Sequence, residues 1–312
     1  MRVRLVAALS IGSRAPLRFV AGSVHSVYRQ ACNLELSDGA LVTLLGREAG
    51  NLPHGIRCAL PEPEDFQVWL RAGQAVAADG LLLRIPEAGM AIALAGAARW
   101  HCALDGCAID PDAESSARIL HAARLALRQH APQGGFAPLL LRDEVPGSWL
   151  EQAMLRRLAT TLPALSQAGS SLDCAAAAQA LGQLAGLGPG LTPSGDDFIV
   201  GYLAALHARC SREPPLPSFV EGLVPALAQL AAAANVISRQ FLLNALAGEF
   251  SELLAQVVSA IAACDGPLLQ QSIARLARVG HSSGADSLVG LLFGLRPALL
   301  IADASTACLA AA

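Results

Sequence analysis

Two stretches of the sequence combine residue types that could hold and transform a small anion. The first reads GLGPGLTPSGDDFIVGYLAAL over residues 186–206, and the second reads SGADSLVGLLFGL over residues 283–295. Both contain the pattern Ser-Gly-x-Asp, and its two serines, Ser194 and Ser283, are 89 residues apart. The glycines and prolines of the first stretch are too dense for helix interior, so they are predicted to form a tight loop that leads into a buried helix.

The start of a helix is suited to binding anions. Its first backbone N–H groups have no partner inside the helix, the helix dipole attracts negative charge, and glycine lets a ligand come close. Gly201 and Gly290 lie two turns into the two helices, where glycine costs about 1 kcal/mol relative to alanine, so they predict two closely packed helices whose starts face one site. The residues predicted to bind the substrate are Gly188, Gly190, Thr192, Ser194, Gly195, Asp196, Asn235, Ser238, Arg239, Ser282, Ser283 and Gly284.

The cap of the first helix has two possible forms. Thr192 as N-cap would place Pro193 at the first helical position, whereas Ser194 as N-cap would form a capping box with Asp197. Either arrangement presents a glycine-rich backbone at a helix start.

Three carboxylates conflict with an anion site, because Asp196, Asp197 and Asp286 would repel the ligand. In one interpretation, which we adopt, Asp197 and Asp286 cap their own helices and leave the N–H groups free, and no cofactor or metal is assigned. In the other, the three carboxylates hold a Mg²⁺ ion that bridges to phosphate.

The predicted catalytic residues are His281, Asp197 and Asp286. His281 directly precedes Ser282 and could act as an acid or base, or donate to a carbonyl oxygen; alternatively, it only hydrogen-bonds to the backbone. Arg239 could hold a carboxylate in a bidentate fork, although an arginine on the first turn of a helix is often solvated.

Composition excludes several classes of function. The chain has 312 residues, of which 54% are hydrophobic and 15% charged. Its net charge is −3 and it has no basic run, so we expect no positively charged surface for binding nucleic acid. All 22 basic residues are arginine, so a Schiff-base, pyridoxal-phosphate, biotinyl or Walker A lysine is excluded. The eight cysteines form no C-x-x-C pair, so we expect them to be reduced thiols. No uninterrupted stretch has the length of a membrane span, so we expect no membrane partner and a cytoplasmic protein.

The pattern of apolar residues changes near residue 110. Short strand-like runs separated by turns such as Asp79-Gly80 fill residues 1–110 and predict a small β-barrel or sandwich. His54 lies there in a loop, where we expect an exposed side chain. Residues 111–312 show helical periodicity, so the predicted fold class is α+β, with a β-rich domain followed by a mainly α-helical one.

The residues quoted above resemble those of the AllH-like family. The similarity rests on residues 186–206, on Asn235-Val236-Ile237-Ser238-Arg239 leading to Gly248, and on Ser283-Gly284-x-Asp286 ending in Gly290. The resemblance implies a subunit of a three-subunit enzyme that interconverts oxalurate plus phosphate with oxamate plus carbamoyl phosphate. It therefore implies a small anionic substrate and hetero-oligomeric protein partners. Two rivals remain open: a non-catalytic assembly subunit, and a stand-alone metal-dependent enzyme acting on phosphorylated small molecules.

Overall fold

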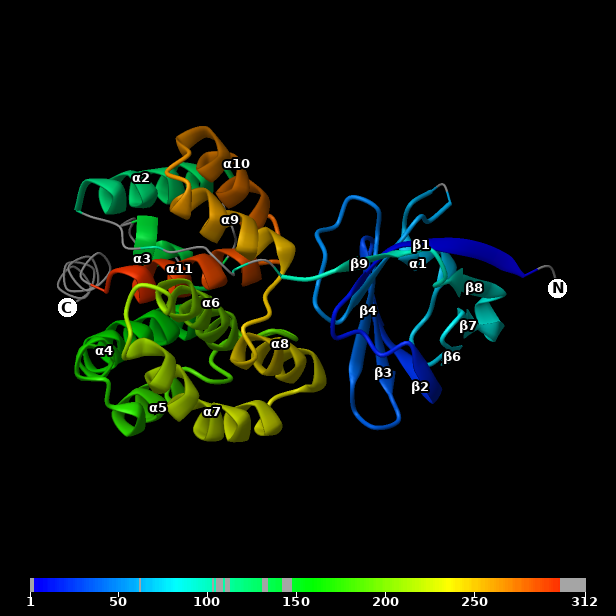
Figure 1. Cartoon of the computed structure of the whole chain (residues 1–312), viewed down its shortest axis with the longest axis horizontal. Coiled ribbons are helices and arrows are strands. Elements are labelled where there is room, and N and C mark those ends of the chain that lie inside the picture. Colours follow the sequence, from blue (N-terminus) through cyan, green and yellow to red (C-terminus); the bar gives the residue numbers. More distant parts are fainter. Residues whose placement is uncertain are drawn as a thin grey trace. The chain divides into compact units, whose positions relative to one another are not determined.

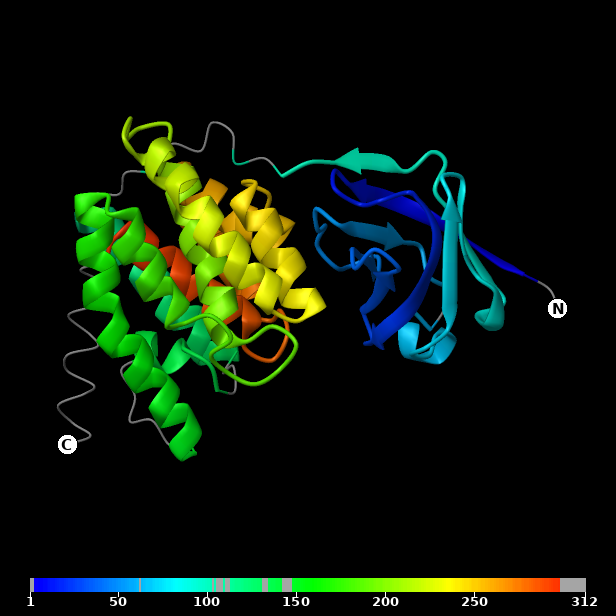
Figure 2. The same ribbon diagram turned by 90° about the horizontal axis from the view of Figure 1, so that it is seen from below.

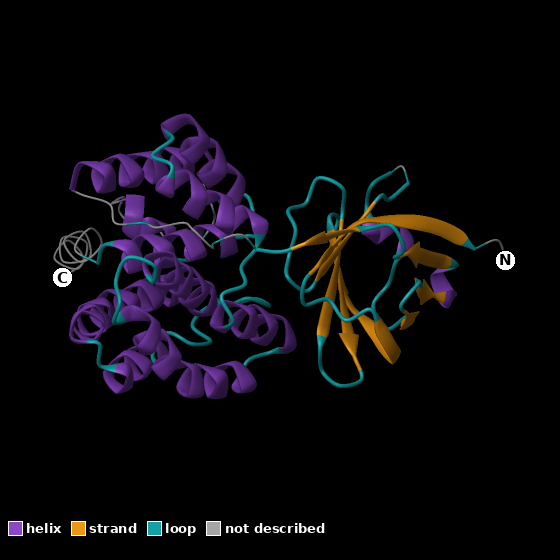
Figure 3. Ribbon diagram, in the orientation of Figure 1, coloured by secondary structure: helices purple, strands orange, loops and turns teal. Residues whose placement is uncertain are grey.

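A computed structural model describes residues 3–297, except for residues 62, 103, 105–108, 110–112, 131–133 and 142–147. Its contacts divide the chain into two compact units, Met1–Cys102 and Ala103–Ala312. The predicted boundary between residues 110 and 111 falls outside the described residues. In the described part of the chain, strands lie in the first unit, and the second unit consists of helices joined by loops (Figure 3).

The first unit is a closed β-barrel. Its strands are β1 (Arg4–Gly12), β2 (Arg18–Val27), β3 (Ala31–Leu36), β4 (Leu41–Leu45), β5 (Gly55–Cys58), β6 (Ala75–Asp79), β7 (Leu82–Ile85), β8 (Met90–Ala93) and β9 (Ala98–Trp100), with a short helix α1 (Phe66–Trp69) and a 3₁₀ turn η1 (Pro86–Ala88) between them. The strand order is β5-β4-β3-β2-β6-β7-β8-β1-β9, and the additional pairing of β1 with β5 closes the ring. Closure leaves no open edge among the first eight strands of that order.

The barrel interior explains two differences from the sequence prediction. Pro53 and His54 lie in a turn before β5, as expected, but His54 is fully buried and not exposed. Desolvation lowers the pKa of His54 to about 3, so its imidazole is neutral at physiological pH. The second difference is that the strand-like runs of the sequence do not include β6 and β9, because alanine-rich segments have little strand propensity.

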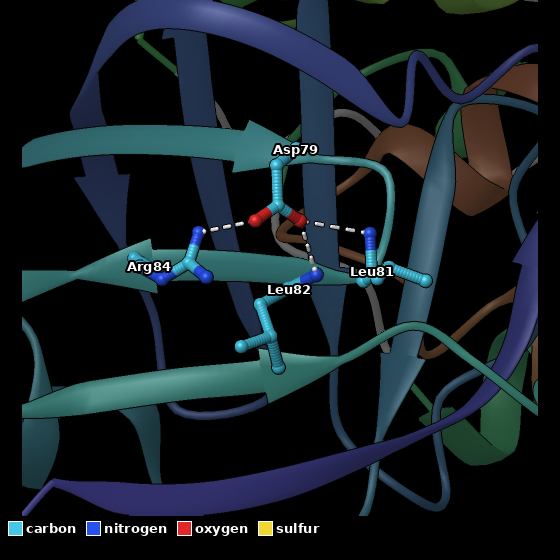
Figure 4. A network of polar contacts seen from close by, with 4 residues as sticks. All are labelled: Asp79, Leu81, Leu82 and Arg84. Atoms are coloured by element: carbon cyan, nitrogen blue, oxygen red, sulfur yellow. Dashed lines mark hydrogen bonds and ion pairs between the residues drawn. The ribbon is translucent and has the colours of Figure 1, made fainter.

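The turn between β6 and β7 was predicted and is present. Asp79 accepts hydrogen bonds from the backbone N–H groups of Leu81 and Leu82, each at 2.9 Å, and from Arg84 at 2.7 Å (Figure 4). Gly80 adopts φ +94°, which glycine tolerates best. The Leu82 N–H, the Arg84 guanidinium and the Leu81 N–H hold the pKa of Asp79 well below its usual range.

The described helices of the second unit lie between residues 113 and 295. They are α2 (Ala113–His130), α3 (Ala137–Leu141), α4 (Trp149–Ser171), α5 (Cys174–Gly182), α6 (Ser194–Arg209), α7 (Leu216–Ala233), α8 (Val236–Leu246), α9 (Glu252–Ala262), α10 (Gly266–Leu276) and α11 (Ser283–Leu295). Within this unit, α6 and α11 lie between a layer of α2, α9 and α10 and a layer of α4, α5, α7 and α8 (Figure 1). The red ribbon of α11 again lies inside the helical unit in Figure 2.

The unit contains an internal repeat longer than the two motifs. Leu172 and Cys264 both adopt left-handed backbone conformations, with φ 56° and 52°. Each is followed by an aspartate that caps the next helix: Asp173 accepts from the N–H of Ala176, and Asp265 from that of Leu268, both at 2.9 Å. Thus α4–α5–α6 and α9–α10–α11 are two versions of one supersecondary unit.

Among the described residues, one helix is long and apolar enough to cross a membrane by length and composition alone. It is α7, and a core helix of a soluble protein passes the same test. Leu216, Phe219 and Leu223 form part of its buried side. The pattern therefore reflects a packed helix as readily as a membrane span.

Candidate functional site at the paired helix starts

The two glycine-bearing helices cross with their backbones in contact, as the sequence predicts. A Cβ atom added to Gly201 would collide with the carbonyl oxygen of Ser287, and one added to Gly290 would collide with the carbonyl oxygen of Phe198. Ser287 is the repeat equivalent of Phe198, so the two contacts are reciprocal. Such reciprocity is the signature of an approximate two-fold axis between the helices.

This crossing brings the two Ser-Gly-x-Asp motifs together. The hydroxyl oxygens of Thr192 and Ser283 are 2.7 Å apart, although 91 residues separate them in sequence. The hydroxyl of Ser283 hydrogen-bonds to the Asp197 carboxyl, and the hydroxyl of Ser194 hydrogen-bonds to the Asp286 carboxyl. The Thr192 and Ser282 hydroxyls contact Asp197 and Asp286 as well, so each carboxyl has hydroxyl partners from both helix starts.

The predicted caps are absent. The N-cap of α6 is Pro193 and that of α11 is Ser282, and neither makes a side-chain cap hydrogen bond. Ser194 is thus the first residue of its helix, and no capping box with Asp197 forms. The helix crossing contributes to this, because the Ser194 and Ser283 hydroxyls contact the aspartate of the other helix start, whereas Thr192 and Ser282 contact the aspartate of their own.

The glycines of the two motifs have a packing role. A Cβ on Gly195 would collide with the carbonyl oxygen of Leu184, and one on Gly284 with that of Leu276. Several amides at the helix starts are also occupied by backbone acceptors: Gly195 donates to Leu187 at 2.9 Å, and Gly284 to Val279 at 3.1 Å. Ligand binding by Gly195 and Gly284 stays a prediction.

Asp197 and Asp286 form a buried pair of carboxyl groups. Their exposed fractions are 6% and 0%. Desolvation first, then the neighbouring charge of Asp286, raises the pKa of Asp197 well above its ordinary value, although the Ser283 and Thr192 hydroxyls lower it. Desolvation likewise raises the pKa of Asp286 to about 6. Two like charges in one apolar site disfavour double ionisation, so the pair retains protons to a higher pH than isolated carboxyls.

One oxygen of each carboxyl has no partner. Among the described residues, Oδ2 of Asp197 and Oδ2 of Asp286 are buried and accept no hydrogen bond. Buried polar atoms are normally satisfied, so two orphaned acceptors at one place need an explanation. Phe136, whose N–H bonds to Asp286, packs edge-on against Phe198, and Phe198 packs against Phe293.

Sequence reasoning missed the segment that packs against Asp286. The backbone N–H of Phe136 donates to Oδ1 of Asp286 at 2.6 Å from 150 residues away. Gly135, at φ +69°, lies so close that an added Cβ would be 2.5 Å from the same oxygen. The sequence signal there is the Gly134-Gly135 pair, which by itself indicates only the end of a helix.

Two family models match most of the chain. One, described as oxamate carbamoyltransferase subunit AllH, matches residues 184–295, and the other, described as the AllH family N-terminal domain, matches residues 4–99. The chain belongs to the AllH family. Comparison with curated proteins and with solved structures gives no match. The first model includes both motifs, and the second coincides with the barrel.

In this AllH-family chain, the Asp196 carboxylate stabilises the loop before α6 through hydrogen bonds. Its Oδ1 accepts from the N–H of Gly186 at 2.7 Å, and its Oδ2 accepts from the hydroxyl of Ser238. Asn235 caps α8 by accepting from the N–H groups of Ile237 and Ser238 at 3.0 and 3.1 Å. These contacts join the start of α8 to the start of α6.

The remaining predicted residues are half-buried or exposed. Arg239 is half-buried on the first turn of α8, next to Ser238. His281 is exposed and Ser282 half-buried in the turn before α11. Gly188 and Gly190 adopt positive φ in the loop before α6, and Gly190 is exposed with open space around it. Their catalytic and binding roles stay predictions.

A three-carboxylate metal site does not form in the part of the chain that the structure describes. No group of three or more His, Cys, Asp or Glu side chains there is arranged to hold a metal ion. Asp196 uses both carboxylate oxygens for Gly186 and Ser238, which removes it from Asp197 and Asp286 as a joint ligand set. The described cysteines are free thiols.

Proposed function

We propose that this chain is a subunit of an oxamate carbamoyltransferase-type complex and binds a small anionic substrate where α6 and α11 begin. The observation that supports a site there is the meeting of the two motifs, with the Thr192 and Ser283 hydroxyls 2.7 Å apart. The family description supplies the reaction class, because it refers to a subunit of oxamate carbamoyltransferase.

Carbamoyl transfer needs groups that orient the substrate and stabilise charge on the carbamoyl oxygen. The hydroxyls of Thr192, Ser194 and Ser283 hydrogen-bond within the protein in this structure, and they are proposed to turn toward such an oxygen when substrate binds. The first turns of two helices add their positive dipole ends. His281 and Arg239 are close in sequence to these groups and are proposed to meet the substrate's outer, carboxylate end. The Asp197–Asp286 pair is proposed to act in proton transfer or substrate orientation.

Protein partners follow from the same proposal, because a subunit acts within a complex. The test is turnover of oxalurate with phosphate by the chain alone and by the chain with its co-purified partners. Phosphate-dependent release of oxamate by the complex is expected, with at least a tenfold loss for Ser283→Ala, as for one donor of an oxyanion site (about 10²-fold for the best-studied case). Absence of turnover by the reconstituted complex would refute the proposed reaction.

A non-catalytic assembly role is the second candidate, and the glycine contacts favour it. Gly201 and Gly290 explain why the helices pack closely without reference to any substrate. Full turnover by a complex carrying Asp197→Asn and Ser283→Ala would support this candidate. A stand-alone metal-dependent enzyme has less support, because the described carboxylates do not converge on a metal position.

A further inference from the structure

We infer that a cavity beside the second half of α6 and the last turn of α11 binds a small uncharged molecule that has an apolar body and one hydrogen-bond acceptor. The cavity has a volume of about 250 Å³ and lies within the helical unit, between α4, α6, α7 and α11. A cavity of about 150 Å³ holds benzene, so this one has room for a substituted ring. No residue of the two Ser-Gly-x-Asp motifs lines it, so the inference does not rest on the proposed function.

Much of the cavity wall is apolar. Each of the four helices contributes buried side chains to it: Leu165 of α4, Leu206 of α6, Leu216 and Phe219 of α7, and Phe293 of α11. Ser166 and Ser170 of α4 also line it, and both are more exposed than these side chains. Apolar walls favour a ligand with an apolar body, because binding removes the apolar area of both partners from water.

The hydroxyl of Tyr202 is the polar group at the buried side of the cavity. Tyr202 is 3% exposed and lines the cavity, and in the described part of the chain its hydroxyl makes no hydrogen bond. Desolvation raises the pKa of Tyr202, so the hydroxyl stays protonated and can donate. The offset that relates Ser194 to Ser283 places Leu291 at the equivalent position of α11, so helix packing does not require a hydroxyl here. A buried tyrosine hydroxyl usually has a partner, and a bound acceptor would supply it.

The charges beside the cavity compensate each other. Of the lining residues, Arg209 and Glu213 carry charge, and they form a bidentate ion pair, with Nε to Oε1 at 2.7 Å and Nη2 to Oε2 at 2.8 Å. Nη1 of Arg209 also donates to the carbonyl oxygen of Gly294 at 2.6 Å. A charged ligand would therefore leave water without gaining a free counter-charge, whereas an uncharged ligand avoids this cost.

Gly169 keeps the space beside the Tyr202 hydroxyl open. A Cβ added to Gly169 would lie 3.4 Å from that hydroxyl oxygen, which is an ordinary contact distance. This differs from Gly201 and Gly290, where a Cβ would collide with backbone. Glycine inside a helix is less favourable than alanine, and close packing does not require it in this part of α4. The missing methyl group leaves the hydroxyl accessible to a small molecule.

The test uses three ring compounds of nearly the same shape. Acetophenone carries a carbonyl oxygen, cumene has a methyl group in place of that oxygen, and benzoate has a charged carboxylate. Binding to the full chain is followed by ligand-observed NMR titration. Acetophenone should bind saturably at millimolar concentration and at least about tenfold more tightly than benzoate, because benzoate would lose its hydration without gaining a counter-charge. No saturable binding of acetophenone, or equal affinities for acetophenone and benzoate, would overturn the inference.

Tyr202→Phe isolates the hydrogen bond. The variant keeps the ring that packs against Phe293, with ring centroids 6.0 Å apart, and removes only the hydroxyl. It should weaken the binding of acetophenone about five- to tenfold and leave the affinity for cumene unchanged or higher. Tyr28→Phe is the matched control, because it removes the hydroxyl of an exposed tyrosine in the barrel, and it should alter neither affinity. Equal changes for the two ligands in Tyr202→Phe would contradict the proposed bond.

Gly169→Ala separates a blocked cavity from an unfolded protein. Its methyl group would occupy the space beside the Tyr202 hydroxyl, so the affinity for acetophenone should fall at least about fivefold. The melting temperature should stay the same or rise, because alanine favours the helix. Gly182→Ala in α5 is the control: Gly182 does not line the cavity, so this variant should leave acetophenone binding unchanged. Wild-type affinity in Gly169→Ala would show that acetophenone does not bind in this cavity.

Discussion

Asp197 and Asp286 occupy equivalent positions in a repeated helix, and each is hydrogen-bonded to the serine of the other motif. Neither aspartate caps its own helix. The repeat therefore does more than duplicate a structural unit, because it produces a buried pair of acids that neither copy contains alone. The following predictions test the packing, the electrostatics and the hydrogen bonds that create this pair.

Replacing either crossing glycine by alanine should destabilise the helical unit. In Gly201→Ala or Gly290→Ala the methyl group meets a backbone carbonyl of the other helix, which cannot move without separating the helices. We expect the free energy of unfolding to fall by about 1–3 kcal/mol or more, measured by urea denaturation. Gly182→Ala in α5 is the control: its nearest neighbour is Leu230 Cδ2 at 4.0 Å, so it should be neutral or stabilising. Equal effects of the three changes would contradict the close crossing.

Asp286→Asn should stabilise the protein at neutral pH. Asp286 has a folded pKa of about 6 against an ordinary value of 3.8, so its contribution to stability is fully present below pH 4 and is lost as pH rises through 6. The asparagine oxygen can still accept from Phe136 N–H. Removing the ionisation should therefore raise the free energy of unfolding by up to about 3 kcal/mol at pH 8, and little at pH 4.

The measurement is thermal or urea unfolding of both proteins between pH 4 and 8. Asp79→Asn in the barrel is a control for which the pH dependence of stability should have the opposite sign. The pKa of Asp79 is lowered by its hydrogen bonds, so its contribution is present above the unfolded pKa and is lost as pH falls. A lower stability of Asp286→Asn at pH 8 than at pH 4, relative to the wild type, would contradict the buried acid pair.

The Thr192–Ser283 hydrogen bond should appear as a coupling energy. In a double-mutant cycle of Thr192→Val and Ser283→Ala, the coupling should be about 0.5–1.5 kcal/mol, because one partly buried bond between neutral hydroxyls is lost in either single variant. Urea unfolding supplies the four free energies. Strict additivity would mean that the two motifs do not meet in solution.

Gly135→Ala should disturb the acid pair although it replaces no residue of either motif. Its methyl group would lie 2.5 Å and 2.8 Å from the two oxygens of Asp286, so the carboxyl or the turn must move. We expect a loss of about 1–3 kcal/mol in stability and a weaker binding of oxamate. Gly134→Ala is a matched control: it has a similar positive φ, but its nearest neighbour is the movable Glu151 Oε1 at 3.0 Å. If both variants bind oxamate equally, the close approach of Gly135 has no role in the site.

The sequence predicted the helix crossing because glycine inside a helix is unfavourable and a matched pair of glycines is best explained by close backbones. It also predicted most barrel strands, since alternating apolar residues bounded by turns such as Asp79-Gly80 are a local signal. These features depend on residues near one another in the chain, and local propensity is what a single sequence records.

Other features depended on contacts between distant segments. Barrel closure needed the pairing of β1 with β5, and the burial of His54 followed from that closure rather than from its Pro-His-Gly context. The caps expected at Ser194 and Asp197 were wrong because a second helix start competes for the same side chains. The hydrogen bond from the Phe136 N–H to Asp286 joins residues that are 150 positions apart in the sequence. The sequence by itself determined which residues could meet at the two helix starts; only the tertiary structure decided that they form a buried acid pair with two unsatisfied oxygens, because desolvation and charge repulsion exist only once those distant groups are packed together.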